Sequence, residues 1–248
     1  MKFAMVCEAP ADRMIAQHLA DRVMLENIPW ADGNLDSIRA WCNEVAADGQ
    51  IRTLEWTAIK HLGNVLGITI RGHFSGEPGL PDARVARRAV LVLQRLLSPD
   101  AVFLVRDTDK DTDRQAGLEQ ARQYFGDTQP KIVIGLAKPE REAWVLAGYV
   151  PENDEENDLL QKQRQTLGFD PCERSEALMA GSDNAAKRSP KRVLHALTSS
   201  SADREEQCWA QTPLELLRRR GAENGLRAYL AEVQSRIVPL FTGRAEPF

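Results

Sequence analysis

Short apolar runs alternate with helical patterns along the first 150 residues, and this alternation constrains the fold more than any other feature. The runs at 2–7, 101–106 and 131–136 are largely apolar, as strands buried on both faces are. Between such runs, apolar residues recur at helical spacing, for example over 11–25 and 82–97. The alternation predicts an α/β protein with a mostly parallel sheet flanked by helices.

Further elements are expected on the same grounds. They are helices over 36–47, over 113–125 and after Pro139, a strand over 65–71, and a glycine- and proline-rich loop over 72–82. From about residue 151 onward the sequence has no convincing strand pattern. The chain is therefore expected to divide into a catalytic domain, 1–150, and a helical C-terminal extension packed on it, 151–248. The expected elements of that extension are helices over 191–197, 213–220 and 222–238 and a surface loop over 199–207.

The composition narrows the class of protein. The chain has 248 residues, a formal net charge of −4 and four widely spaced cysteines without a CxxC motif. This favours neither a zinc site nor a disulfide framework, and it predicts a cytoplasmic protein. No apolar stretch approaches the roughly 18–20 residues of a membrane span, and the first residues are expected to form a strand, not a signal peptide. The acidic charge argues mildly against coating nucleic acid, but a metal-dependent nuclease stays compatible with it.

Acidic residues follow several of the predicted strands. Glu8 ends the first apolar run, Asp107 and Asp109 follow the run at 101–106, and the segment 138–142 follows the third run. Residues at the carboxyl ends of parallel strands can meet at one edge of the sheet. Crowded carboxylates repel one another unless a cation neutralises them, and their oxygens suit Mg²⁺. Asp12, one helical turn after Glu8, is a further candidate ligand.

The DxD pair has an ordinary interpretation as well. Such a pair is often a solvated turn, and Asp111 or Asp113 is expected to cap the helix that begins near 113. The metal interpretation depends on the combination of the pair with the earlier strand-end Glu8 and the later acidic segment.

The order of three motifs resembles Toprim-fold proteins. The motifs are CEAPAD, FLVRDTD and KPEREAWVLAG. The chain is most similar to the small bacterial Toprim-like family designated DUF4276, and more distantly to the nuclease domain of overcoming-lysogenization-defect (OLD) proteins. A later segment, SPKRVLHAL, also resembles a Pro-Lys segment of that family. Ala9 and Pro10 stand where Toprim proteins commonly carry glycine.

The resemblance implies a Mg²⁺-dependent nuclease, with Mn²⁺ as an alternative ion, in a bacterial defence system against phages and mobile elements. It implies that Glu8 is a metal ligand or general base and that Asp107 and Asp109 are metal ligands. Glu142 is then the functional acid of its segment and a ligand of a second metal. It also implies nucleic acid as the substrate and an ATPase partner encoded nearby.

Basic residues supply candidates for contacts to phosphate. Lys138 stands beside the acidic segment and could contact the scissile phosphate. The candidates for nucleic-acid binding are Arg84 and Arg88 on the helix after the loop, and Lys187, Arg188, Lys191 and Arg192 in the densest basic cluster. The choice between DNA and RNA, and self-association into a homo-oligomer, stay open.

Other classes of function share parts of this pattern. A non-catalytic regulatory or effector subunit of an ATPase-containing complex would carry the same fold. A phosphatase of the haloacid-dehalogenase type also uses DxD after a strand, but there the pair follows the first strand, and here it lies mid-chain. The absence of a GxxxxGK[ST] motif argues against nucleotide hydrolysis by this chain.

Overall fold

A computed structural model describes residues 1–42, 44–45, 51–52, 54–70, 73–74, 76–109, 111, 113–126, 128, 130–179, 181, 183 and 185–243. The chain forms two compact units. Unit 1 comprises Met1–Arg106, Thr112–Gly135 and Ala231–Phe248, and unit 2 comprises Asp107–Asp111 and Leu136–Leu230. Unit 2 therefore takes in residues from both of the domains expected from the sequence, whose boundary at 150 stays a prediction.

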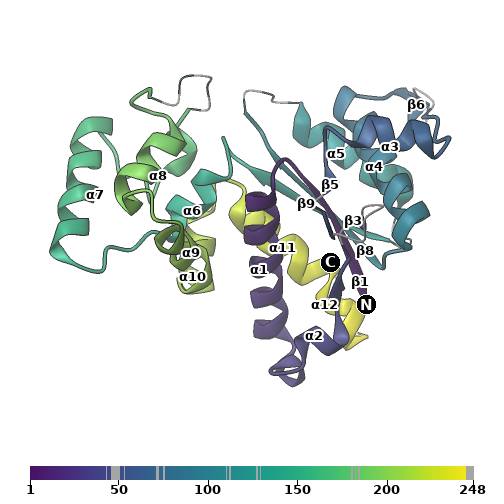
Figure 1. Cartoon of the computed structure of the whole chain (residues 1–248), viewed down its shortest axis with the longest axis horizontal. Coiled ribbons are helices and arrows are strands. Elements are labelled where there is room, and N and C mark those ends of the chain that lie inside the picture. Colours follow the sequence, from purple (N-terminus) through teal and green to yellow (C-terminus); the bar gives the residue numbers. More distant parts are fainter. Residues whose placement is uncertain are drawn as a thin grey trace. The chain divides into compact units, whose positions relative to one another are not determined.

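A mostly parallel sheet forms the centre of unit 1, as predicted (Figure 1). Its central strand, β1 (Lys2–Cys7), pairs in parallel with β8 (Ala101–Asp107) on one side and with β2 (Ala40–Trp41) and β5 (Leu54–Glu55) on the other. Strand β9 (Lys131–Ala137) follows β8 in the strand order. The α/β fold class is confirmed.

Helices bury the sheet because β1 is apolar on both faces. Every residue of β1 after Lys2 is buried, and both α1 (Pro10–Asn27) and α4 (Pro81–Leu97) contact this strand. Helix α1 turns its buried apolar residues, such as Ile15 and Leu19, toward the core at a spacing of four. The helical periodicity in the sequence thus corresponds to the observed buried face.

Close packing of α4 against α5 (Arg114–Phe125) requires a glycine. A Cβ at Gly117 would lie 2.9 Å from the Cβ of Asp82, so no other residue fits without a shift. The remaining elements of unit 1 are α3 (Ile59–Val65), the antiparallel pair β6 (His73–Phe74) and β7 (Glu77–Pro78), the antiparallel pair β3 (Glu44–Val45) and β4 (Ile51–Arg52), η1 (Pro29–Ala31) and α12 (Val238–Thr242).

Three local predictions in unit 1 are wrong. The helix expected over 36–47 is only the short α2 (Leu35–Ile38), and the strands β2 and β3 follow it; residues 43, 46 and 47 lie outside the described part. The strand expected over 65–71 is absent from its described residues, 65–70, because α3 continues to Val65, which is 69% exposed and has no sheet to pack on. The loop expected over 72–82 contains β6 and β7 and the start of α4.

Helices build unit 2 around α6 (Glu142–Gly148), whose seven residues are all buried. Helices α8 (Pro190–Thr198), α9 (Ala202–Ala210) and α10 (Leu214–Arg220) each contact α6, and α7 (Asp154–Leu167) contacts α8. The remaining elements are η2 (Ser175–Ala177) and the first part of α11 (Leu226–Arg236). Trp144 of α6 is buried and stacks on Tyr229 with ring centroids 5.1 Å apart, so this tryptophan belongs to the core of unit 2.

The surface loop expected over 199–207 is wrong, because α9 begins at Ala202. Ser201 caps this helix by accepting a hydrogen bond from the Arg204 backbone N–H at 3.3 Å, and acidic residues occupy the first turn. The sequence SSSADREEQ thus holds a helix start that its polar composition conceals. In the described residues from 151 onward there is no strand, as expected.

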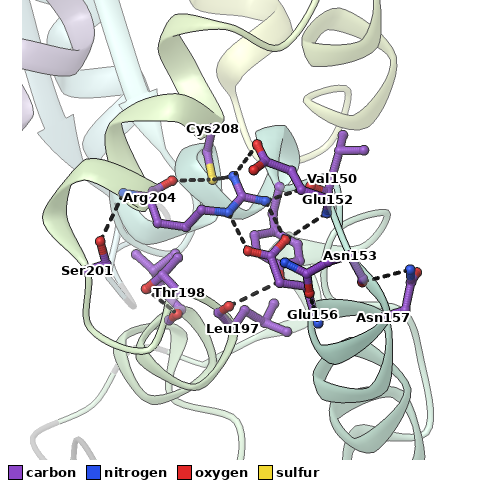
Figure 2. A network of polar contacts seen from close by, with 12 residues as sticks. Val150, Glu152, Asn153, Glu156, Asn157, Leu197, Thr198, Ser201, Arg204 and Cys208 are labelled. Carbon is purple, nitrogen blue, oxygen red and sulfur yellow. Dashed lines mark hydrogen bonds and ion pairs between the residues drawn. The ribbon is translucent and has the colours of Figure 1, made fainter.

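A half-buried ion pair joins α7 and α9 within unit 2 (Figure 2). Arg204 donates to both carboxylate oxygens of Glu156, at 2.7 and 2.8 Å, and to the carbonyl oxygen of Val150 at 2.6 Å. Its guanidinium lies 4.8 Å from the ring centroid of Tyr149, whose hydroxyl donates to the Leu197 carbonyl at 3.1 Å. This two-point pairing is the strong geometry for arginine and carboxylate.

Candidate functional site

Two acid-bearing loops of unit 2 are joined by hydrogen bonds. The Asp109 backbone N–H donates to the Pro139 carbonyl at 2.9 Å. In return, the Arg141 backbone N–H donates to the Asp107 carboxylate Oδ1 at 2.8 Å. The loop after β8 and the loop after β9 therefore run side by side, which supports the expectation that the acids following these two strands lie together.

Asp109 adopts an unusual backbone conformation. Its φ is +49°, in the left-handed region that non-glycine residues rarely occupy. Aspartate tolerates this region better than most residues, but the conformation still costs on the order of 1 kcal/mol. Strained residues of this kind are concentrated at functional sites, so the conformation of Asp109 adds weight to this loop as a candidate site.

Two glutamates of the second loop are buried beside these aspartates. Glu140 is 6% exposed and Glu142 is 5% exposed. Burial raises the pKa of Glu140, Lys191 opposes that shift, and the negative charges of Glu142 and Asp109 add to it. We refer to these four carboxylates as the acidic cluster: Asp107, Asp109, Glu140 and Glu142.

Basic side chains approach the two glutamates unequally. Arg141 donates to Glu142 at 2.8 Å. The Lys191 ammonium lies 3.6 Å from Glu140 Oε2, which is an ion pair beyond hydrogen-bond distance. Among the described residues, none donates a hydrogen bond to this buried oxygen. A buried acceptor without a donor is rare and marks a place where a ligand could bind.

Glu140 is the residue of the site that the sequence alone did not reveal. The resemblance implies Glu142, and not Glu140, as the functional acid of this segment. Helix α6 begins at Glu142, and Glu140 precedes it in a turn that is buried. The fully apolar run after Glu142 was the available signal, because it predicts a helix so deeply buried that an acid just before it is also removed from water.

Asn224 and Gly225 hold the backbone of the second loop. The Asn224 carbonyl accepts hydrogen bonds from the Lys138 backbone N–H at 2.9 Å and from the Trp144 indole at 3.0 Å. Gly225 has a φ of +87°, and a Cβ there would lie 1.8 Å from the Leu136 carbonyl oxygen. Lys138, expected near the scissile phosphate, is thus anchored through its backbone between β9 and α6.

The acids predicted in unit 1 have partners there. Glu8 lies 3.3 Å from Arg106 and 3.9 Å from Arg114, and both arginines also pair with Asp82. Asp12 accepts a hydrogen bond from the Ala9 backbone N–H at 2.7 Å and so caps α1. Their expected role as metal ligands stays a prediction.

Arg84 and Arg88, on α4 of unit 1, differ in exposure. Arg84 is exposed, whereas the half-buried stem of Arg88 packs over α3, where a Cβ at Gly63 would lie 2.5 Å from Arg88 Cδ. Of this predicted pair, Arg84 therefore has the more accessible charge.

The basic cluster of unit 2 is divided among several contacts. Lys187 and Arg188 are exposed, and the Arg188 guanidinium lies 5.8 Å from the Phe169 ring centroid. Arg192 donates to the Lys187 carbonyl at 2.7 Å and to Gln163 at 3.1 Å, which fixes the turn before α8. Lys191, from the same basic cluster, forms the ion pair with Glu140 of the acidic cluster.

The donor chemistry of the acidic cluster suits a hard divalent cation. Among the described residues, no three His, Cys, Asp or Glu side chains are grouped as a preformed metal cage. Mg²⁺ does not require one, because it is usually held by one or two carboxylates, water and substrate phosphate. The buried Glu140 Oε2, flanked by like charges and without a hydrogen-bond donor, is the observation that fits such an ion.

Comparison of the chain with family models, curated proteins and solved structures finds no match. No helix in the described part of the chain is both long and apolar enough to cross a membrane.

Proposed function

We propose that this chain is a Mg²⁺-dependent nuclease and that the acidic cluster of unit 2 holds the metal. The observation that carries the proposal is the buried Glu140 carboxylate, which faces the negative charges of Glu142 and Asp109 and whose Oε2 receives no hydrogen bond from the described residues. An excess of buried negative charge is costly unless a cation compensates it.

The chain's own residues would share the work as follows. One or two carboxylates of the acidic cluster would hold the ion, together with water and substrate phosphate. The candidates are Glu140 and the three acids expected from the sequence, Asp107, Asp109 and Glu142; Asp107 and Asp109 belong to the loop that is joined to the second loop by hydrogen bonds. An ion held there would supply electrostatic stabilisation of negative charge on a phosphoryl group. Glu8 is proposed as a further ligand or general base.

The substrate class follows from the resemblance to Toprim-fold nucleases and from the basic residues of unit 2. Lys187 and Arg188 are exposed, so their charges are accessible to a phosphate backbone. An ATPase partner and a role in defence against phages belong to the proposal through that resemblance.

Cleavage assays with matched variants test the proposal. Purified protein is incubated with plasmid DNA and with tRNA, in Mg²⁺, in Mn²⁺ and with EDTA. We expect metal-dependent cleavage that falls by about 100-fold or more in Asp109→Asn, because a ligand is lost. Asp158→Asn, which removes an exposed carboxylate on α7, should retain full activity. Absence of cleavage, alone or with a neighbouring ATPase, would overturn the nuclease and favour a non-catalytic subunit.

A further inference from the structure

Lys191 makes the one cationic contact that the structure records with Glu140 in the described part of the chain, and that contact is loose. The ammonium stands 3.6 Å from Glu140 Oε2, while the carboxylate side chain is only 8% exposed. The charge is compensated in part, but the oxygen's hydrogen-bonding capacity is not.

The Lys191 side chain is also well placed to leave. It is 43% exposed, so water can solvate the ammonium as it departs. Its neighbour Arg192 is held by hydrogen bonds to Lys187 and Gln163, and the Ser189 hydroxyl caps the same turn. The backbone at the start of α8 is therefore fixed, whereas the flexible four-carbon stem of Lys191 can swing from it.

We propose that Lys191 occupies the place of a divalent cation at Glu140, and that metal binding releases Lys191 to bind a phosphate of the nucleic acid. The inference rests on the proposed function and deepens it, because it names a residue through which metal and substrate are coupled. Lys191 competes with the metal for Glu140 and becomes an additional phosphate contact once the metal is bound.

A coupling of this kind is reciprocal. If the metal raises the affinity for nucleic acid by some factor, then nucleic acid raises the affinity for the metal by the same factor. The protein would thereby bind its metal most tightly when substrate is present, and Lys191 would carry that dependence.

Mn²⁺ binding, measured by electron paramagnetic resonance, tests the competition without a need for turnover. Lys191→Met should bind Mn²⁺ about fivefold more tightly than the unaltered chain. A partly exposed ion pair contributes about 1 kcal/mol, which corresponds to this ratio of affinities. Lys162→Met, which removes an exposed lysine of α7, should leave the affinity unchanged. In the background of Glu140→Gln, the Lys191→Met change should have no effect on Mn²⁺ affinity.

Fluorescence anisotropy with a cleavage-resistant phosphorothioate oligonucleotide tests the release. Mn²⁺ should raise the affinity of the unaltered chain for this probe, and Lys191→Met should lose most of that increase. Lys191→Gln should behave alike, and thermal melts of both variants report whether they fold.

The outcomes separate the two proposals. Equal or weaker Mn²⁺ binding by Lys191→Met and Lys191→Gln, when both are folded, would overturn the competition. Absence of Mn²⁺ binding by the unaltered chain would overturn both the competition and the metal-dependent nuclease. The expected binding results combined with no cleavage of DNA or RNA would support the coupling and overturn the nuclease alone.

Discussion

Two glutamates of unit 2, the half-buried Glu156 and the buried Glu140, meet their basic partners in opposite ways. Glu156 receives two short hydrogen bonds from Arg204, which lower its pKa. Glu140 meets Lys191 at 3.6 Å, and burial raises its pKa in spite of that neighbour. The first acid is stabilised in its charged form by the fold itself, whereas the second is not.

This difference distinguishes a glutamate that stabilises the fold from a glutamate that is a candidate for binding a cation. A carboxylate that arginine engages at both oxygens is stabilised little by another cation. A buried carboxylate with two acidic neighbours and one ammonium at 3.6 Å is stabilised much more by an added cation. The predictions below test whether this contrast is real, beginning with the largest expected effect.

The backbone packing next to the acidic cluster can be disrupted by a substitution that changes no charge. Gly225→Ala should lower the free energy of unfolding by about 4 kcal/mol or prevent folding, because its Cβ would lie 1.8 Å from the Leu136 carbonyl oxygen. Gly168→Ala is the matched control: it has a similar φ of +79° with no atom within 4 Å, and strain alone should cost about 1 kcal/mol. Urea unfolding compares them, and equal losses would show that the close approach is relieved cheaply.

Removal of arginine from the tight pair should be the next largest effect. Arg204→Met should lower the free energy of unfolding by about 3 kcal/mol, because the half-buried Glu156 loses its cationic partner and both hydrogen bonds from it. Arg204→Lys should recover only part of that loss, since lysine lacks the planar fork that engages both oxygens. Chemical denaturation gives both values. A loss below about 1 kcal/mol in Arg204→Met would mean that the pair resembles an exposed one.

The contrast between the two pairs is not readable from the sequence. Periodicity predicted the parallel sheet and most helices, because burial of β1 on both faces and of one side of α1 leaves a regular apolar pattern. It also placed Asp107 at the carboxyl end of β8 and Asp109 just beyond that strand. The distance from Lys191 to Glu140 depends on how the two loops and α8 pack, and such packing joins residues about 50 positions apart.

The misassigned elements fail for two different reasons. The helix expected over 36–47 ends at Ile38, because the chain then pairs with β1 as strand β2. Helix α9 was missed because its caps and charges look like a loop until Ser201 is recognised as a helix start. The tertiary partner therefore decides the structure at β2, whereas a local helix cap decides it at α9.

The pH dependence of stability should have opposite signs at the two glutamates. The pKa of Glu156 is lowered from its ordinary 4.5, so its contribution is present above that value and is lost as the pH falls through the folded pKa. The pKa of Glu140 is raised, so its ionisation destabilises the fold at neutral pH, and this cost disappears as the pH falls from the folded pKa toward 4.5.

Replacing each glutamate by glutamine measures separately how its carboxylate changes the free energy of unfolding. At pH 7, Glu156→Gln should cost about 2 kcal/mol, while Glu140→Gln should stabilise the metal-free chain by about 1 kcal/mol. Glu155→Gln, exposed on α7, should be neutral. Urea unfolding from pH 4 to pH 8 measures each. Destabilisation by Glu140→Gln at pH 7 would mean that its carboxylate is already well compensated, and the contrast would be lost.

The smallest expected change in the free energy of unfolding is that of Lys191, the partner of Glu140. Lys191→Met should change the free energy of unfolding by less than about 1 kcal/mol, because its ammonium is 43% exposed and its contact with Glu140 is long. Thermal and urea unfolding at pH 7, with Lys162→Met as the control, measure the change. A loss as large as that of Arg204→Met would mean that Lys191 is a structural partner of Glu140. A small loss means that the fold does not need the pair, so the buried carboxylate is retained at a cost to stability that binding of a cation would offset.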